Sequence, residues 1–144
     1  PWFDRLALMF QREVAERLAA KPDTEHYGRL SVLTQWRAKA KILFDVSRSA
    51  FVPPPKITSS IVRIEPLEKP VAAARLADLE KVTAAAFGQR RKMLRSSLKQ
   101  LTPFPELLLK RAGLEPERRA EELSVEDFAR LALIWDEIGA VEKT

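Results

Sequence analysis

Hydrophobic and polar positions change their spacing near residue 67 of the chain. Before this point short apolar runs alternate with segments of helical spacing, and beyond it the spacing is helical throughout. The apolar run Arg5 to Phe10 predicts a strand. Gln11 to Ala20 places Val14, Ala15 and Leu18 on one side, as an amphipathic helix does. The chain therefore opens with a strand followed by a helix.

The rest of the first part continues this mixed pattern. Residues 29–37 predict a second helix, and residues 41–46 and 59–64 predict two strands because they are rich in branched apolar residues. No helical segment separates these two strands, so we expect them to pair antiparallel. The order strand, helix, helix, strand, strand indicates an α/β unit.

Only helices are predicted beyond a linker that contains Pro66 and Pro70. The helical segments are residues 73–87, 90–101, 105–112 and a last helix after Ser124. Ser124-Val125-Glu126-Asp127 has the side chains of a capping box. The last helix directs its apolar side toward the core, and the positions concerned are Phe128, Ala132, Trp135 and Ile138. Trp36 is also expected in the core. The predicted fold class is α/β plus all-α, with domains 1–67 and 68–144.

Composition excludes several kinds of site. The chain of 144 residues has no cysteine and one histidine, which excludes disulfides and makes a zinc site implausible. No apolar run approaches the roughly 20 residues that a membrane helix needs. Hydrophobic residues make up 46% and charged residues 31%, the balance of a soluble folded protein. We expect no metal and no membrane partner, and a cytoplasmic location.

Few of the titratable side chains in the first part suggest catalysis. His26 has no serine or carboxylate at a telling spacing and is expected in an exposed loop. Glu13 and Glu16 share a helix side, but Arg12 and Arg17 lie among them. This mixture predicts a solvated helix surface with ion pairs rather than a metal site.

Positive charge is concentrated in one stretch. All charged residues between positions 81 and 105 are basic, and they are Lys81, Arg90, Arg91, Lys92, Arg95 and Lys99. If this stretch is helical, the apolar stripe consists of Phe87, Leu94, Leu98 and Leu101, and the cations that fan out along one flank of it are Arg91, Lys92, Arg95 and Lys99. A solvated surface usually mixes signs, so the stretch indicates a polyanionic partner. The alternative is pairing with the acidic last segment, in surface pairs worth about 0–1 kcal/mol each.

Phe51 precedes three consecutive prolines, Lys56 and a predicted strand. Each proline fixes its φ angle and lacks a backbone donor, so the segment beside the ring is extended and stiff. This arrangement suggests a platform that holds a flat ring, with Lys56 as a phosphate contact. The alternatives are that Phe51 covers the edge of a core and that Lys56 is a solvated lysine.

Three segments together resemble the rRNA adenine N6,N6-dimethyltransferase family. They are F-V-P-P-P-K-I-T-S-S-I-V-R-I from Phe51, M-F-Q-R-E-V-A-E-R-L from Met9 followed by Y-G-R-L-S-V from Tyr27, and A-F-G-Q-R-R-K-M-L-R-S-S-L from Ala86. They occur in the same order as in that family. The resemblance extends from about Leu6 to Ile138.

The resemblance implies the C-terminal portion of a Rossmann-like methyltransferase sheet, closed by a reversed strand, and a small helical rRNA-binding domain. The implied enzyme uses S-adenosylmethionine to dimethylate N6 of two adjacent adenines near the 3′ end of small-subunit rRNA, during ribosome assembly. Phe51 would stack on the target adenine. The RNA contacts would be Lys56, Arg90, Arg91, Lys92, Arg95 and Lys99.

In the family, the S-adenosylmethionine site and an Asn-Leu-Pro-Tyr segment precede the part that this chain resembles, and neither motif occurs here. We therefore expect the C-terminal part of a longer enzyme, inactive alone. The implied partner is the 30S pre-ribosomal particle, bound by a monomer. Two alternatives stay open. One is a non-catalytic nucleic-acid-binding module, as in transcription factors related to the family, and the other is a large-subunit rRNA adenine methyltransferase.

Overall fold

A three-stranded antiparallel sheet organises the first half of the chain in the computed structural model, which describes residues 4–54 and 56–142. The strands are β1 (Leu6–Gln11), β2 (Ala38–Val46) and β3 (Ser59–Pro66), in the order β1-β3-β2. β3 lies in the centre and runs antiparallel to both neighbours. The antiparallel pairing expected for the last two strands is thus confirmed.

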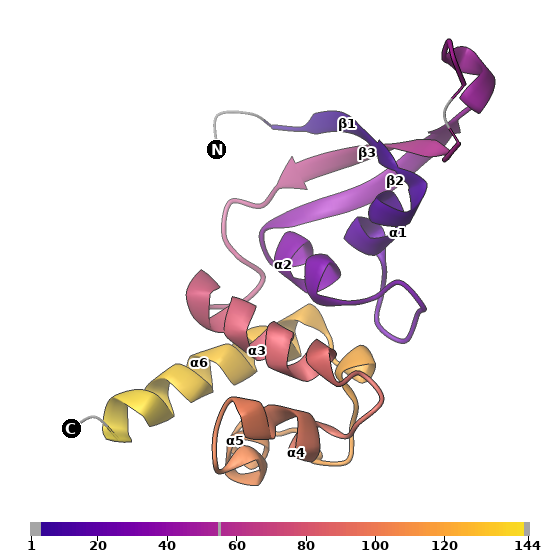
Figure 1. The fold of residues 1–144 in the computed structure, drawn as a ribbon. Coiled ribbons are helices and arrows are strands. Elements are labelled where there is room, and N and C mark those ends of the chain that lie inside the picture. Colours follow the sequence, from indigo (N-terminus) through magenta and orange to yellow (C-terminus); the bar gives the residue numbers. More distant parts are fainter. Residues whose placement is uncertain (1–3, 55, 143–144) are drawn as a thin grey trace.

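One face of the sheet is covered by α1 (Arg12–Ala19) and α2 (Arg29–Arg37) (Figure 1). Val62, in the middle of β3, is fully buried on this side. Its neighbours across the sheet are Leu8 of β1 and Ile42 of β2. Because side chains alternate along a strand, this row and the rows two residues away face the helices.

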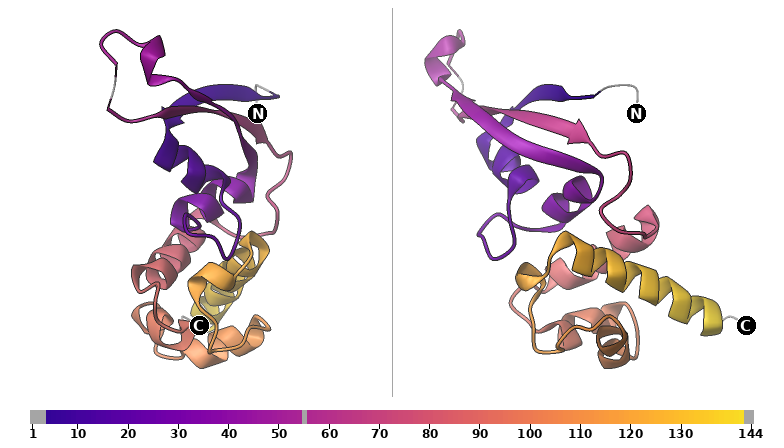
Figure 2. Two further views of the ribbon diagram at one scale, coloured as in Figure 1. Left: turned by 90° about the vertical axis from the view of Figure 1, so that its right-hand side faces the viewer. Right: turned by 180° about the vertical axis from the view of Figure 1, so that it is seen from behind.

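The opposite face of the sheet carries exposed apolar side chains. Met9 and Phe44 both align with Ile61 and are 52% and 59% exposed. Their row alternates with that of Val62, so it points away from α1 and α2. In the described part of the chain no helix covers this face (Figure 2).

The second half of the chain contains α3 (Leu76–Gly88), α4 (Leu94–Ser97), α5 (Pro105–Arg111) and α6 (Val125–Glu142). α3 packs against α6, and α4 packs against α5 (Figure 1). The predicted capping box is confirmed: Ser124 Oγ accepts from the Asp127 N–H at 3.1 Å, and Asp127 Oδ2 accepts from the Ser124 N–H at 3.0 Å. These bonds satisfy amides that the helix start leaves free.

The single helix predicted for residues 90–101 is wrong. α3 ends at Gly88, a turn follows, and only α4 and the short 3-10 helix η2 (Leu98–Gln100) are helical. Glycine is a poor helix former, which favours a stop there. In addition, the backbone N–H groups of Leu94 and Arg95 donate to carbonyl groups in residues 116–118, at 2.8 and 3.1 Å. These long-range bonds replace the helical ones that the projection assumed.

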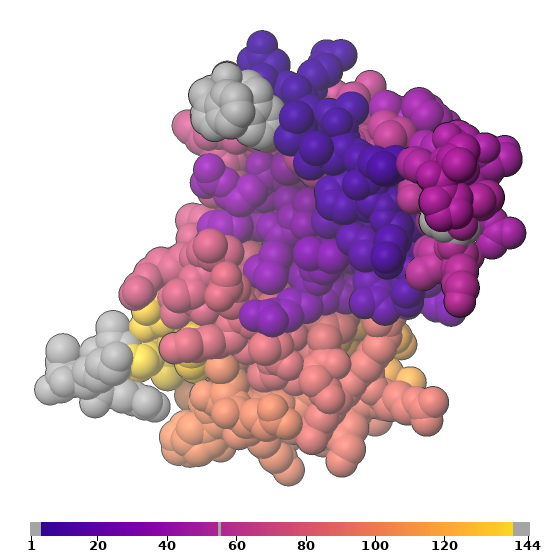
Figure 3. Space-filling model, turned by 45° about the horizontal axis from the view of Figure 1, so that its top comes forward, coloured from indigo at the N-terminus to yellow at the C-terminus, as the bar shows by residue number. Residues whose placement is uncertain are grey.

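One hydrophobic core runs through both halves. Tyr27 and Trp36 of the first half belong to the same buried cluster as Leu79, Leu98 and Phe128 of the second. Trp36 is 5% exposed, as predicted for a core residue. The two halves share this core, and Figure 3 shows them in close contact on the face that it presents.

Two aromatic side chains donate hydrogen bonds across the boundary predicted at residue 67. The Tyr27 hydroxyl donates to the Leu123 carbonyl at 2.6 Å, and Trp36 Nε1 donates to the Ala72 carbonyl at 2.8 Å. Two buried aromatic side chains thus fix the helical half against the sheet half. None of the described helices has the length and apolar character that crossing a membrane requires.

Candidate nucleic-acid interface

The loop between β2 and β3 projects from one end of the sheet and carries Phe51 (Figures 1 and 2). A short 3-10 helix, η1 (Arg48–Ala50), precedes Phe51, whose N–H donates to the Arg48 carbonyl at 3.3 Å. The Phe51 side chain is partly exposed and lies outside the buried core. Pro55 lies outside the described residues, so the structure covers Pro53 and Pro54 of the proline run. Phe51 is therefore reachable from solvent.

A hollow of about 790 Å³ lies against this loop. It is lined by residues 45–49 together with Pro54, Lys56 and Thr58, and Phe51 is not among them. Arg48 Nη1 donates to the Lys56 carbonyl at 2.9 Å, so two cationic residues meet at the hollow. Arg48 was not predicted from the sequence. Its position three residues before Phe51, between two serines, is the signal that would have indicated it.

The base of the loop is fixed by Asp45. Its carboxylate accepts from Ser60 Oγ at 2.6 Å and lies 3.3 Å from Arg12 Nη1. Arg12 also pairs with Glu16 at 2.9 Å. The hydrogen bond to Glu16, with the charge of Asp45 as a second cause, raises the pKa of Arg12. The start of α1 is thereby linked to the segment that presents Phe51.

The carboxylates on α1 form the solvated pairs that the sequence predicts. Arg17 pairs with Glu13 at 2.9 Å, four residues apart. His26 departs from its prediction, because its Nε2 lies 2.7 Å from Glu16 Oε2 and its side chain is 33% exposed. This contact joins a loop to a helix, and sequence spacing gives no sign of it. In the described residues no group of three His, Asp or Glu side chains is placed to hold a metal ion.

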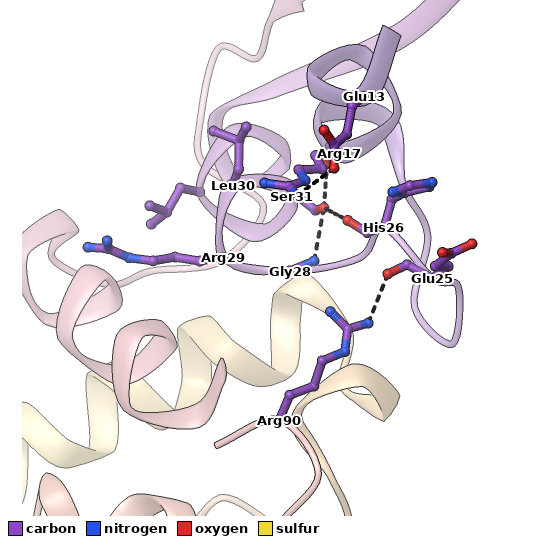
Figure 4. A pocket seen from close by; sticks show the side chains of 10 residues that line it. Glu13, Arg17, Glu25, His26, Gly28, Arg29, Leu30, Ser31 and Arg90 are labelled. Carbon is purple, nitrogen blue, oxygen red and sulfur yellow. Dashed lines mark hydrogen bonds and ion pairs between the residues drawn. The ribbon is translucent and has the colours of Figure 1, made fainter. Parts of the chain in front are cut away.

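A second hollow, of about 530 Å³, separates α1 and the start of α2 from Arg90 (Figure 4). Its cationic lining residues are Arg17, Arg29 and Arg90, and Glu13 and Glu25 supply negative charge. Of these three cations only Arg90 was predicted as an RNA contact, because Arg17 and Arg29 lie outside the all-basic stretch.

Arg90 is occupied by internal contacts. Its Nε lies 3.2 Å from Glu121 Oε2, and its Nη2 donates to the carbonyls of Thr24 and Glu25 at 3.2 and 3.3 Å. The guanidinium also stands over the Phe87 ring at 5.9 Å. For Arg90, therefore, the alternative of pairing with the acidic last segment holds.

The other cations of the basic stretch have a different environment. Within this stretch, the exposed cations that form no ion pair with any described residue are Lys81, Arg91, Lys92, Arg95 and Lys99. Arg91 and Lys92 occupy the turn after α3, Arg95 lies on α4, and Lys99 lies on η2. This set, with Lys56, is free to meet an anionic ligand.

Comparison with known proteins agrees with this geometry. The family model described as ribosomal RNA adenine dimethylase matches residues 2–137. The chain belongs to this family. The family indicated by the three sequence segments is thus confirmed.

Members of the ribosomal RNA adenine dimethylase family show high identity to the chain. The relatives include proteins named ribosomal RNA small subunit methyltransferase A. The protein from Azorhizobium caulinodans is 61% identical over 132 residues, covering 92% of this chain and 45% of the relative. The protein from Rhodospirillum rubrum is 58% identical over 139 residues, covering 96% and 48%. The chain spans about half the length of these curated relatives.

Solved structures support a methyltransferase fold. A dimethyladenosine transferase from Plasmodium falciparum superposes with a TM-score of 0.83 and 27% identity, covering 96% of this chain and 59% of that one. The 23S rRNA methyltransferase ErmE superposes with a TM-score of 0.62 and 23% identity, covering 94% and 56%. The second likeness concerns the fold alone.

Proposed function

We propose that this chain forms the base-holding and RNA-binding part of an S-adenosylmethionine-dependent rRNA adenine N6,N6-dimethyltransferase. Its substrate would be two adjacent adenines near the 3′ end of small-subunit rRNA. The observation that carries the proposal is that two halves with a common core present a partly exposed Phe51 and a set of exposed cations that have no acidic partner within the described residues. The names of the relatives favour the small-subunit substrate over the large-subunit one.

Methylation of adenine N6 requires the base to leave its stack. The N6 lone pair is delocalised into the ring, and a duplex buries this edge of the base, so the enzyme must extrude and hold the nucleotide. The Phe51 ring would support one face of the extruded adenine. Positive charge that develops on N6 would lie near the ring, with an attraction of about 0.5–2 kcal/mol. Phe51 would act through position and electrostatics, not as an acid or base.

The described residues do not form a suitable binding site for the methyl donor. S-adenosylmethionine would supply the methyl group, but the described residues provide no glycine-rich turn after a strand. We therefore assign the donor site to the part of the relatives that this chain does not cover. We likewise assign β1, β2 and β3 to the C-terminal end of a larger Rossmann-like sheet. Residues 1–67 would complete that sheet, and residues 68–144 would form the helical RNA-binding domain.

The exposed cations would hold the RNA backbone. Arg91, Lys92, Arg95, Lys99 and Lys56 would each neutralise phosphate, giving affinity that falls steeply with salt and carries little sequence information. Arg90 would act mainly by fixing the turn of residues 89–92, the basic turn, against residues 24–25 and Glu121. The partner would be the 30S pre-ribosomal particle, met in the cytoplasm by a monomer.

Substitution of Phe51 in an active methyltransferase that contains this chain tests the proposal. Phe51→Ala should lower methyl transfer to 30S particles by about 10- to 100-fold, the range expected for loss of one base–aromatic stack. RNA affinity should change far less, because the phosphate contacts remain. Val52→Ala is the matched control, since Val52 is adjacent, 98% exposed and not aromatic. Unchanged turnover in Phe51→Ala would remove Phe51 from the mechanism. A non-catalytic module would show no methyl transfer in the unsubstituted protein.

A further inference from the structure

A third hollow, between α4 and α5, has an exposed aromatic ring at its rim. Its volume is about 460 Å³, and it is lined by Arg95, Ser96 and Lys99 on one side and by residues 103–107 on the other. Phe104 belongs to the second side and is 57% exposed. No part of the proposed adenine-holding role of Phe51 uses this hollow.

The backbone around Phe104 is held in place. Pro103 and Pro105 flank it, and each has a fixed φ angle. Pro105 is buried and begins α5, while the Phe104 N–H donates to Thr102 Oγ1 at 3.1 Å. An exposed ring on such a constrained backbone loses little conformational freedom when a ligand covers it, which favours binding.

The hollow is cationic. Arg95 and Lys99 are exposed and form no ion pair within the described part of the chain. Glu106 is the one carboxylate among the lining residues. Two free cations beside a flat apolar ring suit a ligand that combines an anionic group with an aromatic one.

We propose that this hollow binds one unpaired nucleotide of RNA, with the base stacked on Phe104 and a neighbouring phosphate paired with Arg95 and Lys99. Exposed aromatic rings combined with basic side chains are the usual means of binding single strands, because every base offers a π-face. A duplex keeps its bases stacked inside and cannot offer such a face. The inference rests on the proposed function, since that makes RNA the partner.

The predicted consequence is a preference for unpaired RNA. Arg95 and Lys99 alone would bind phosphates of single and double strands alike. Phe104 adds a contact that only an unpaired base can make. The helical half would thus recognise a second unpaired nucleotide in addition to the target adenine.

Fluorescence anisotropy with labelled oligoadenylate and with an RNA duplex of the same length tests this preference. For Phe104→Ala the dissociation constant for oligoadenylate should rise by about 5- to 100-fold, and that for the duplex should stay unchanged. Phe104→Tyr, which keeps a ring, should retain binding. Leu133→Ala is the matched control, because Leu133 lies on α6 outside this hollow, is 37% exposed and has no ring. Far-ultraviolet circular dichroism verifies that each variant is folded.

The outcomes separate this inference from the proposed function. If Phe104→Ala leaves oligoadenylate affinity unchanged while Arg95→Ala lowers it, the stacking site is refuted and the RNA-binding surface stands. If neither RNA binds the unsubstituted chain, the proposed RNA-binding role fails together with this inference. Sedimentation provides a third outcome. Self-association that Phe104→Ala abolishes, with RNA binding intact, would identify a second copy of the chain as the occupant and overturn the inference.

Discussion

The Tyr27 hydroxyl offers a sharp test of how the two halves are held together. Tyr27 is fully buried, its hydroxyl donates to the Leu123 carbonyl at 2.6 Å, and its ring meets the Phe87 ring edge-on at 5.9 Å. Tyr27→Phe keeps the ring and removes the donor. The buried carbonyl loses its partner, which should lower the free energy of unfolding by about 1–3 kcal/mol. For a chain of this size each kcal/mol lowers Tm by about 2–4 °C.

The pH dependence of this loss has a defined sign. Burial raises the pKa of Tyr27, and the charges of Asp127 and Asp23 add to the effect. In the unfolded chain tyrosine titrates at a pKa of about 10. The folded state therefore holds the proton more tightly, and this contribution to stability is complete below about pH 10 and is lost as the pH rises toward the higher folded value. The Tyr27→Phe protein lacks this contribution, so the difference in free energy of unfolding between the two proteins should shrink in strong alkali.

Urea unfolding of both proteins, at neutral pH and above about pH 10, measures the two effects. The chain contains one tyrosine, so the ultraviolet absorbance of tyrosinate reports Tyr27 alone. In the folded protein tyrosinate should appear only at a pH above the ordinary value. Equal urea midpoints at neutral pH, or tyrosinate formation near the ordinary pKa in the folded chain, would refute the reasoning.

Two further predictions concern charge and backbone conformation. Arg91→Ala combined with Arg95→Ala should reduce the slope of log affinity for RNA against log salt by about one to two. Lys39 is an exposed cation on β2, and Lys39→Ala should leave the slope unchanged. An unaltered slope in the double variant would exclude both arginines from RNA binding. Gly113→Ala should destabilise the chain by about 1–2 kcal/mol because Gly113 has a φ of 72° and no neighbour for an added Cβ within 4 Å, so the cost lies in the backbone alone. Gly139→Ala, within α6 and also without a neighbour within 4 Å, should instead stabilise by about 1 kcal/mol, and thermal unfolding that gave both changes the same sign would contradict this view.

Local features of the fold were predictable from the sequence. The bounds of α2 match the predicted segment 29–37, and the start of α6 follows the capping box at Ser124. Both depend on periodicity and on side chains within a few residues. The turn of residues 89–92 was predicted wrongly as part of a helix, because the N–H groups of Leu94 and Arg95 just after it donate to carbonyls in residues 116–118. Local spacing contains no information about such partners.

The contacts that build the candidate site were the least predictable. Arg90 meets residues 24 and 25, which lie 66 and 65 positions earlier in the chain. Asp45 is held by Arg12 and Ser60, which come from two other elements. Phe104 has no sequence signal beyond its flanking prolines, and its role depends on α4 lying beside α5. The contacts of Arg90 and Asp45 join segments well separated in sequence, whereas the hollow at Phe104 joins two segments that are close in sequence but whose packing local spacing does not give.

The core common to both halves has a consequence for substrate choice. Because Tyr27 and Trp36 lock the helical half to the sheet half, the span from Phe51 to the basic turn cannot stretch or shorten freely. If the proposed RNA partner contacts both ends, the protein would hold its two binding sites at a fixed distance. It would accept an adenine only when that base stands at a set distance from a suitably folded stretch of backbone, so selectivity would come from the shape of the ribosomal RNA and not from its sequence.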